Sequence, residues 1–338
     1  AELRITNTRF SSETVAIGRS ARVMAEILPP SVETFKITPM NNGLALSTVT
    51  IRRSDLEALE FQPQAADALL AVSNISGAAP NLVGEIRPEG QFPQLSFSLG
   101  PYIQPSYFDP DRPVRADAGI EAQFNYRFGQ GWNVAGSLRH RLTGNIGTSN
   151  RLSNSVLPRV RTNAILYARG SSTYIQDLYV SKQWKAGTNT YARLSAGYLE
   201  QMFGGVSGEL LWKPTNSRLA LGVEGNYVKQ RSFDRDLDFQ SYSVATGHVS
   251  AYYEMNNGYL AQLDVGRYLA GDYGATMTLT REFANGWKVG GFFTLTDVSA
   301  ADFGEGSFDK GIQLTVPVKW FIGSSSKRTN STTIRPIQ

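Results

Sequence analysis

The sequence predicts an all-β transmembrane barrel of the outer-membrane type, with about 12 antiparallel strands, behind a small N-terminal periplasmic α/β unit. Three observations predict it. Between residues 95 and 321, segments of about ten residues alternate apolar and polar side chains. Charged residues are only 18% of the 338 residues, whereas Gly numbers 32 and aromatic residues make up 11%. No apolar stretch approaches the roughly 18 residues that a transmembrane helix requires.

Residues 1–92 are predicted to form the small β-α-β-β unit and a linker. A helix is expected up to about residue 28, where two prolines follow, because its apolar residues share one face: Ile17, Ala21, Met24 and Leu28. Segments 35–37 and 44–51 predict a hairpin around Asn41-Asn42-Gly43, a sequence that tolerates positive φ. Short helices are expected near 54–59 and 64–72, and prolines between 80 and 93 predict the linker.

Residues 93–322 are predicted to form the barrel, and 116–128 show its pattern most clearly. Even positions there are apolar: Ala118, Ile120, Ala122, Phe124, Tyr126 and Phe128. Odd positions are polar or small: Asp117, Gly119, Glu121, Gln123, Asn125 and Arg127. Because successive side chains of a strand point to opposite faces, one face is predicted to meet lipid and the other to line a lumen.

The same pattern predicts the other strands. Together the predicted strands span 95–108, 114–128, 132–145, 173–185, 189–203, 205–214, 218–231, 242–255, 259–270, 273–284, 287–298 and 310–321. Tight turns such as 129–131 and 256–258 alternate with long loops such as 146–172 and 299–309. Short turns on one rim and long loops on the other are typical of outer-membrane barrels. An even strand count would place both the N-terminal unit and a C-terminal tail, residues 323–338, in the periplasm.

A soluble β-sandwich or large soluble barrel is the alternative fold, since its strands also alternate. It would bury the apolar face, so that Phe124, Leu221 and Leu314 would pack together at a dry centre. Two features favour the membrane barrel: the long, uniform strands, and aromatic residues that gather at strand ends as an interfacial girdle would require. The aromatic residues are Tyr126, Phe128, Trp132, Trp184, Trp212, Tyr253, Phe283, Trp287 and Trp320.

The polar face supplies the candidate site. The predicted lumen-lining residues are Glu121, Arg127, Arg139, Arg141, Arg193, Glu209, Glu224, His248, Asp264 and Lys319. Two interpretations of this face stay open: a hydrated channel that contacts a sugar polymer, and an interior filled by ion pairs and hydrogen bonds.

Composition and charge exclude other classes. The absence of Cys excludes zinc-finger, iron–sulfur, disulfide-framework and thiol-nucleophile proteins. The formal net charge is +4 without a basic cluster, so no nucleic-acid partner is expected. Asp302, Glu305 and Asp309 could bind a cation in their loop, but three acids in eight residues favour a solvated loop, so no metal site and no cofactor are predicted.

Several segments go beyond the strand pattern. They are LEQMFGGVSGE at 199–209, VKQRSFD at 228–234, TGH at 246–248, GRYLAGDYG at 266–274 and FGEGSFDKG at 303–311. These segments resemble the YjbH family of Gram-negative exopolysaccharide and group 4 capsule proteins. The resemblance implies an outer-membrane barrel that acts, without catalytic residues, in producing or exporting a polysaccharide. It implies outer-membrane lipid, polysaccharide, and periplasmic or lipoprotein export partners. Family chains are longer, so this chain is a C-terminal half, a processed product or a shorter relative.

Within that resemblance the expected role is non-enzymatic, as a conduit or as a docking platform for export partners. Two alternatives remain. One is an outer-membrane lipid hydrolase, because His248 and Ser250 are two residues apart and share a strand face. That face points inward, away from lipid, and we therefore expect no enzyme. The other is a structural barrel with a plugged lumen.

Overall fold

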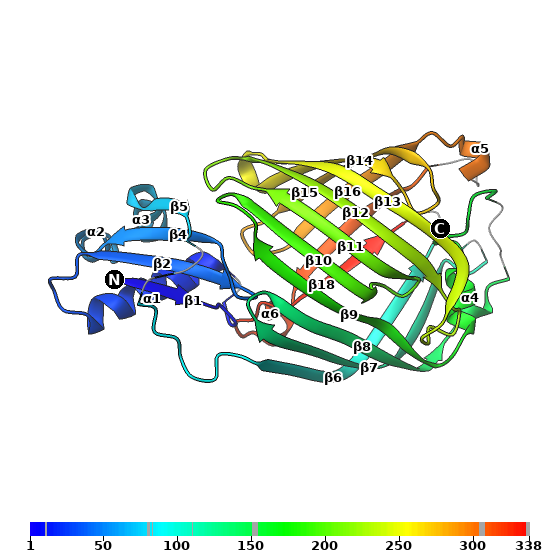
Figure 1. Ribbon diagram of the computed structural model, residues 1–338, viewed down its shortest axis with the longest axis horizontal. Helices are drawn as coiled ribbons and strands as arrows, with labels where there is room; N and C mark the ends of the chain where they lie inside the picture. The colour runs from blue at the N-terminus through cyan, green and yellow to red at the C-terminus, as the bar shows by residue number, and fades with distance from the viewer. Residues whose placement is uncertain are drawn as a thin grey trace.

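The computed structural model describes residues 1–10, 12–79, 82, 84–109, 111–150, 155–303 and 308–335. It consists of an N-terminal unit with a five-stranded sheet and a 13-stranded antiparallel sheet that curls into a nearly closed barrel (Figure 1). None of the described helices combines the length and apolarity that crossing a membrane would require.

The N-terminal unit has the predicted β-α-β-β order. Its elements are β1 (Glu2–Ile5), α1 (Glu13–Ile27), β2 (Thr34–Asn41), β3 (Leu44–Ala45), β4 (Ser47–Arg52), α2 (Arg53–Leu59), α3 (Ala65–Val72) and β5 (Asn74–Gly77). The sheet order is β1-β2-β4-β5, and β1 runs parallel to β2 because α1 crosses over between them. One face of α1 packs on the sheet in a core of Ala21, Met24, Phe35, Ile37, Ile51 and Leu56. The sequence did not predict β5, which pairs with β4.

All twelve predicted segments form strands of the barrel. They are β6 (Gln94–Tyr107), β7 (Val114–Gly129), β8 (Trp132–Gly144), β9 (Thr173–Lys185), β10 (Thr190–Tyr198), β11 (Phe203–Trp212), β12 (Leu219–Arg231), β13 (Phe239–Glu254), β14 (Tyr259–Arg267), β15 (Tyr273–Glu282), β16 (Lys288–Thr296) and β17 (Lys310–Pro317). Each strand pairs antiparallel with the strands before and after it in the chain. Where the connection is a tight turn, the length of that turn fixes the register of the two strands.

A thirteenth strand corrects the prediction for the C-terminal region. β17 ends at Pro317, a short helix α6 (Lys319–Ile322) follows, and β18 (Thr329–Ile334) pairs with β17. The predicted tail 323–338 therefore contributes a strand, and the predicted strand 310–321 is shorter. Proline cannot donate to the ladder, which explains the end of β17 at this position.

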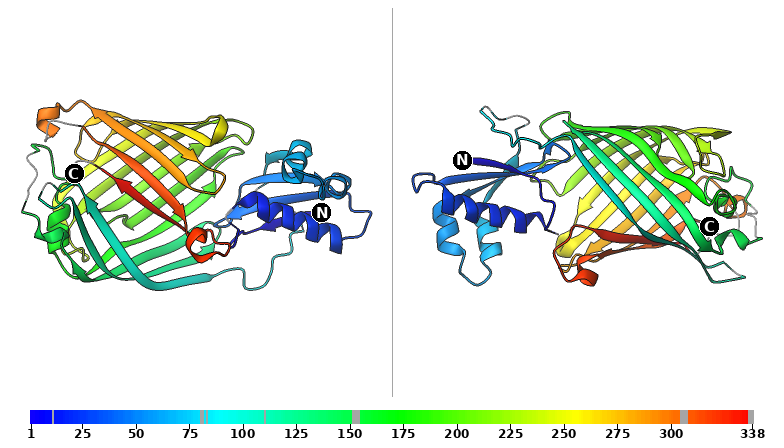
Figure 2. Two further views of the ribbon diagram at one scale, coloured as in Figure 1. Left: turned by 180° about the vertical axis from the view of Figure 1, so that it is seen from behind. Right: turned by 90° about the horizontal axis from the view of Figure 1, so that it is seen from below.

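The odd strand count also changes the side on which the chain finishes. We call the barrel end that faces the N-terminal unit the near rim and the opposite end the far rim. Figures 1 and 2 show β18 running away from the N-terminal unit toward the far rim. The prediction that the N-terminal unit and the C-terminal segment share one side is therefore wrong.

The two edge strands, β6 and β18, do not pair with each other among the described residues. Both run from the near rim to the far rim, so they flank the seam of the barrel in parallel orientation. Pro101 and Pro105 lie in β6. Because proline lacks an N–H, both are compatible with an edge strand and not with a central one.

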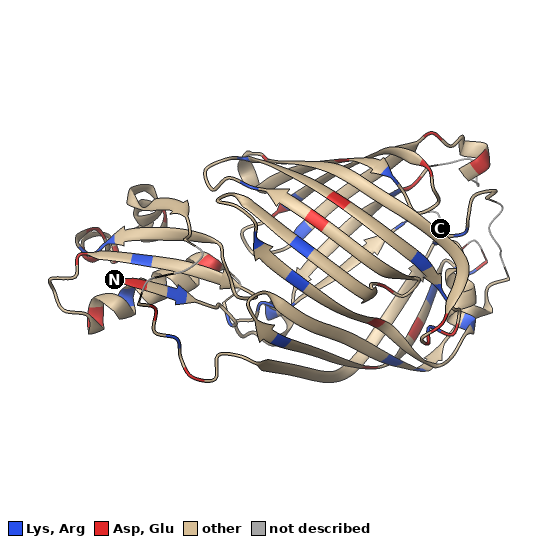
Figure 3. Cartoon of the chain, viewed as in Figure 1, with Lys and Arg blue, Asp and Glu red and all other residues tan. Residues whose placement is uncertain are grey.

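The apolar face of the sheet points outward. Leu221 and Val223 are 42% and 48% exposed, and neither hydrophobic core contains Phe124, Leu221 or Leu314. The dry centre that a soluble barrel would require is therefore not formed by these residues. Acidic and basic residues lie on neighbouring strands halfway along the barrel wall (Figure 3).

The connections differ between the rims as predicted. Turns at the near rim are short, apart from the segment that contains α6. At the far rim, residues 145–150 and 155–172, with α4 (Ala164–Arg169), and residues 232–238 form a folded layer that we call the far-rim cap. Tyr167 of this cap packs in a hydrophobic core with residues of the strands beneath it: Met202, Phe203, Val228 and Val244. The far rim is thus an ordered structure with its own hydrophobic core.

Candidate functional site: the polar lumen

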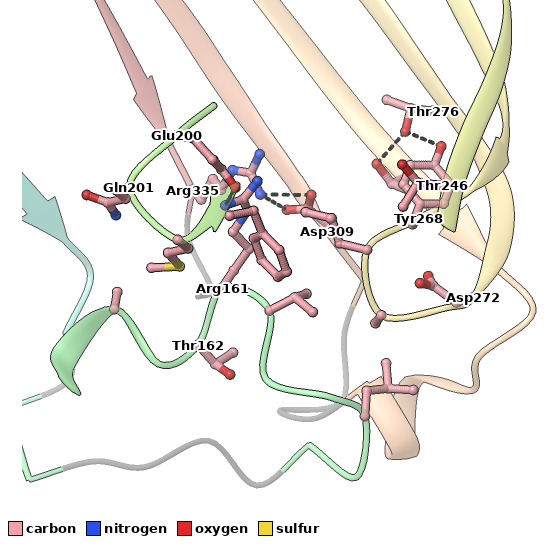
Figure 4. A pocket seen from close by; sticks show the side chains of 18 of the residues that line it. Arg161, Thr162, Glu200, Gln201, Thr246, Tyr268, Asp272, Thr276, Asp309 and Arg335 are labelled. Carbon is pink, nitrogen blue, oxygen red and sulfur yellow. Dashed lines mark hydrogen bonds and ion pairs between the residues drawn. The ribbon is translucent and has the colours of Figure 1, made fainter. Parts of the chain in front are cut away.

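A cavity of about 1020 Å³ lies inside the barrel beneath the far-rim cap. Inward-facing residues of β12 to β17 form one wall, and cap residues such as Leu157, Val160 and Arg161 form another; Figure 4 shows Arg161 at this cavity. The strand wall carries the titratable residues Glu224, His248 and Asp264 together with hydroxyl and amide side chains: Asn226, Thr246, Gln262, Thr276, Thr278, Thr280, Thr294 and Gln313. Uncharged groups of this kind both donate and accept hydrogen bonds, as sugar hydroxyls do.

Most of the predicted lumen charges lie in pairs across neighbouring strands. Arg139 donates from Nε to Glu121 Oε1 at 2.7 Å, and Arg193 donates from Nη2 to Glu209 Oε2 at 2.8 Å. In both pairs the register places the two residues directly opposite each other. Such pairing neutralises the wall, so the lumen presents no strong field of one sign.

Arg141 lies on the same wall, nearer to the far rim, and contacts the far-rim cap. Its Nη1 is 3.5 Å from Asp117 Oδ2 and also donates to the carbonyl of Ala168 in α4. The Asp117 carboxylate in turn accepts from the backbone N–H of Ile146 at 3.1 Å. The sequence predicted the inward direction of Arg141 but not its role in holding the cap, because that role depends on tertiary contacts.

His248 and Ser250 both face the lumen but have different partners. His248 Nδ1 lies 3.2 Å from Glu224 Oε1, and its buried Nε2 has no hydrogen-bond partner among the described residues. Ser250 instead donates from Oγ to Asp264 Oδ1 at 2.6 Å, and Gln262 also donates to Asp264. The serine is thus bonded to a carboxylate and not to the imidazole that would activate it.

Of the two remaining candidates, Arg127 lines a second pocket at the near rim and Lys319 lies in α6. Lys319 is therefore outside the strands, since β17 ends two residues before it. The sequence placed it on a strand because the alternation continues through Val316 and Val318 to Trp320.

Several polar atoms that line the cavity have no partner in the described part of the chain. They are Thr162 Oγ1 in the far-rim cap, His248 Nε2 on β13 and Asp272 Oδ1 in the β14–β15 loop. A buried polar atom without a partner is costly, and a polar molecule in the cavity that reached one of these groups would remove that cost. The sequence alone could not reveal them.

Two of the three acids that the sequence analysis considered for a cation have protein partners. Asp309 pairs with Arg335 Nη1 at 3.0 Å, while Asp302 accepts from Ser299, and Glu305 lies outside the described residues. Burial raises the pKa of the Asp309 carboxyl group, and the Arg335 guanidinium opposes that shift. No cluster of three potential metal ligands occurs in the parts of the chain that the structure describes.

Comparison with known proteins gives two findings. The chain matches the YjbH family model, described as "Exopolysaccharide biosynthesis protein YbjH", over residues 1–338. It is also 30% identical over 328 residues to the "Uncharacterized lipoprotein YjbH" of Escherichia coli strain K12. That match covers 93% of this chain and 46% of the relative, so the chain spans about half of the relative's length.

Proposed function

This chain belongs to the YjbH family of exopolysaccharide biosynthesis proteins, and from that membership we propose that it acts in exopolysaccharide secretion as an outer-membrane barrel whose lumen contacts the polymer. The observation that carries the proposal is a hydroxyl- and amide-rich cavity of about 1020 Å³ inside a barrel with an apolar exterior. Its role is that of a conduit or of a docking platform for periplasmic or lipoprotein export partners.

An outer-membrane position is supported by the outer surface. Exposed aliphatic side chains occupy the middle of the strands, for example Leu194, Val223 and Val249. Exposed aromatic residues surround the near rim: Phe128, Trp132, Trp212, Tyr253, Phe283, Trp320 and Phe321. An apolar band bordered by aromatic side chains matches the hydrocarbon core and its interface. With the N-terminal unit in the periplasm, the C-terminal strand would then finish at the outer surface.

Two basic residues on the outer face fit the same position. Arg267 lies at the far-rim end of β14, with its guanidinium 5.6 Å from the centre of the Tyr273 ring. Arg281 lies near the other end of β15, 5.1 Å from the Tyr259 ring. Charges at strand ends can reach the headgroup region, whereas charges at mid-strand could not.

The far-rim cap limits how a polymer could pass. Cap residues line the cavity together with the strands, so the passage of a polymer through the far rim would depend on the cap, whereas a docking platform would not. Planar-bilayer conductance separates the two roles. We expect low conductance from the intact protein and a higher conductance when the Arg161–Glu200 ion pair, 2.6 Å between Nη1 and Oε1, is broken by Glu200→Gln.

The secretion role predicts a loss of exopolysaccharide on gene deletion. We expect extracellular polysaccharide to fall to background and to return with the unaltered gene. Thr246→Trp should restore it poorly, because the indole fills the cavity from β13. Ala245→Trp, on the outer face of the same strand, is the matched control and should restore it fully. Unchanged polysaccharide after deletion would refute the role.

A lipid hydrolase is the alternative function, and the geometry at β13 favours non-enzymatic action. Phospholipid cleavage by the pure protein is expected to be absent, because Ser250 bonds Asp264 and faces away from lipid. Hydrolysis that disappears in Ser250→Ala would establish the hydrolase instead.

A further inference from the structure

Among the described residues, hydrogen bonds join the N-terminal unit to the near rim at three places. Asn42 Nδ2, at the tip of the β2–β3 hairpin, donates to the Gly131 carbonyl in the β7–β8 turn at 3.3 Å. Lys185 Nζ donates to the Ala78 carbonyl just after β5 at 2.8 Å. Lys327 Nζ, in the segment before β18, lies 2.7 Å from Glu13 Oε1 in α1. Three separate parts of the rim thus hold three separate parts of the unit.

The hairpin tip closes one side of a second pocket, of about 600 Å³, at this rim. The barrel wall supplies the other side from β7 to β11. The lining consists of Asn41, Asn42, Asn125, Arg127, Asn133, Tyr179, Ser181, Gln183, Arg193, Ser195, Leu199 and Ser207. Five amides, three hydroxyls and a phenol make this lining suited to a sugar ring, and it contains no Asp or Glu.

Two groups in this pocket lack a suitable partner. The buried Asn42 Oδ1 has no hydrogen-bond donor among the described residues. Arg127 donates from Nε to Asn125 Oδ1 at 3.3 Å and forms no ion pair in the described part of the chain. Arg193, the other guanidinium, is already paired with Glu209. The pocket therefore contains one cation without a counter-ion and is bordered by an amide, that of Asn42, whose buried oxygen would gain a donor if the side chain turned toward a sugar hydroxyl group.

We propose that this near-rim pocket binds a carboxylate-bearing sugar unit, with Arg127 contacting the carboxylate and Asn42 contacting a hydroxyl group. Charge-assisted bonds of a guanidinium to a carboxylate are among the strongest hydrogen bonds in proteins, and they select acidic over neutral sugars. The inference deepens the proposed function, on which it rests, by naming the sugar class of the polymer.

The site exists only while the N-terminal unit is docked, because the unit supplies Asn41 and Asn42. A ligand that contacts both sides binds the docked state better than the undocked state, and it therefore stabilises docking.

The test is calorimetric titration of the detergent-solubilised full chain with a galacturonate hexamer, and with maltohexaose as the neutral probe. Arg127→Gln should weaken hexamer binding about tenfold or more, because a charge-assisted bond is lost. Asn42→Gly should weaken it about fivefold, because a neutral bond is lost. Glycine suits this position, where φ is +48°. Asn257→Gly, in a near-rim turn with φ +62°, is the matched control and should bind normally.

Hydrogen exchange gives a second measurement. The hexamer should slow amide exchange in both 41–44 and 129–131, the two segments that meet in the docked state. No binding of the hexamer, equal binding of maltohexaose, or equal losses in Asn42→Gly and Asn257→Gly would each overturn the proposal. These results do not depend on cellular polysaccharide levels, so failure of the site and failure of the secretion role are distinguishable.

Discussion

Replacing Val223 by Arg is expected to cost the barrel about 2–4 kcal/mol of folding free energy in lipid, because a cation would face hydrocarbon near the bilayer midplane. Val223 lies near the middle of β12, opposite Leu210 on β11 and Val249 on β13, and all three are exposed on the outer face. The double variant Val223→Arg/Val249→Arg should lose more folding free energy than the single variant and should fail to insert into lipid vesicles.

The size of this effect distinguishes a lipid-facing wall from a water-facing one. An exposed Val-to-Arg change in water is usually within about 0.5 kcal/mol. Asn226→Arg, three residues along β12 and facing the lumen, is the matched control and should cost little, because lumen positions of barrels tolerate charge. Urea titration of the folded fraction in vesicles, followed by heat-modifiable gel migration, measures both. Equal, small losses in the two variants would contradict an outer-membrane position.

Strand positions could be predicted from the sequence because the barrel wall has one apolar and one polar face. Apolar and polar side chains therefore alternate along each strand with a period of two residues. The sequence did not predict β18, because most of its outward-facing residues are polar: they are Asn330, Thr332 and Ile334. The alternation of apolar and polar residues is therefore absent from β18, and Pro317 ends the preceding strand, β17. Missing one strand also reversed the predicted side of the C-terminal segment.

The candidate site was predicted only in part. The inward direction of Glu121 and Arg193 follows from parity, but the partner of each depends on strand register, which bulges shift, as between Ala118 and Gly119. The far-rim cap and the docked N-terminal unit depend on contacts between distant segments. Asn42 was recognised as a turn residue, yet its place in a near-rim pocket required the three-dimensional arrangement.

Arg231 is a buried side chain that ties the far-rim cap to the barrel strands. It is fully buried, and its guanidinium donates to the carbonyls of Ile175, Glu200 and Arg235 at 2.9 Å each. A further carbonyl, that of Gln176, lies at 3.2 Å. The guanidinium carbon also lies 4.6 Å from the centre of the Tyr198 ring. One side chain thus satisfies backbone acceptors from β9, from the β10–β11 connection and from the β12–β13 loop.

Arg231→Met should therefore destabilise the far-rim cap by about 3–5 kcal/mol, because several carbonyls lose a charged side-chain donor at once. Methionine approximates the volume of the arginine stem, so the loss reflects hydrogen bonding more than packing. Arg218→Met, at an exposed near-rim position, should leave stability unchanged. Limited proteolysis of the cap in folded protein measures the difference. Because the cap bounds the large cavity, we also expect greater conductance in Arg231→Met, and protease resistance equal to that of the control would show that other contacts hold the cap.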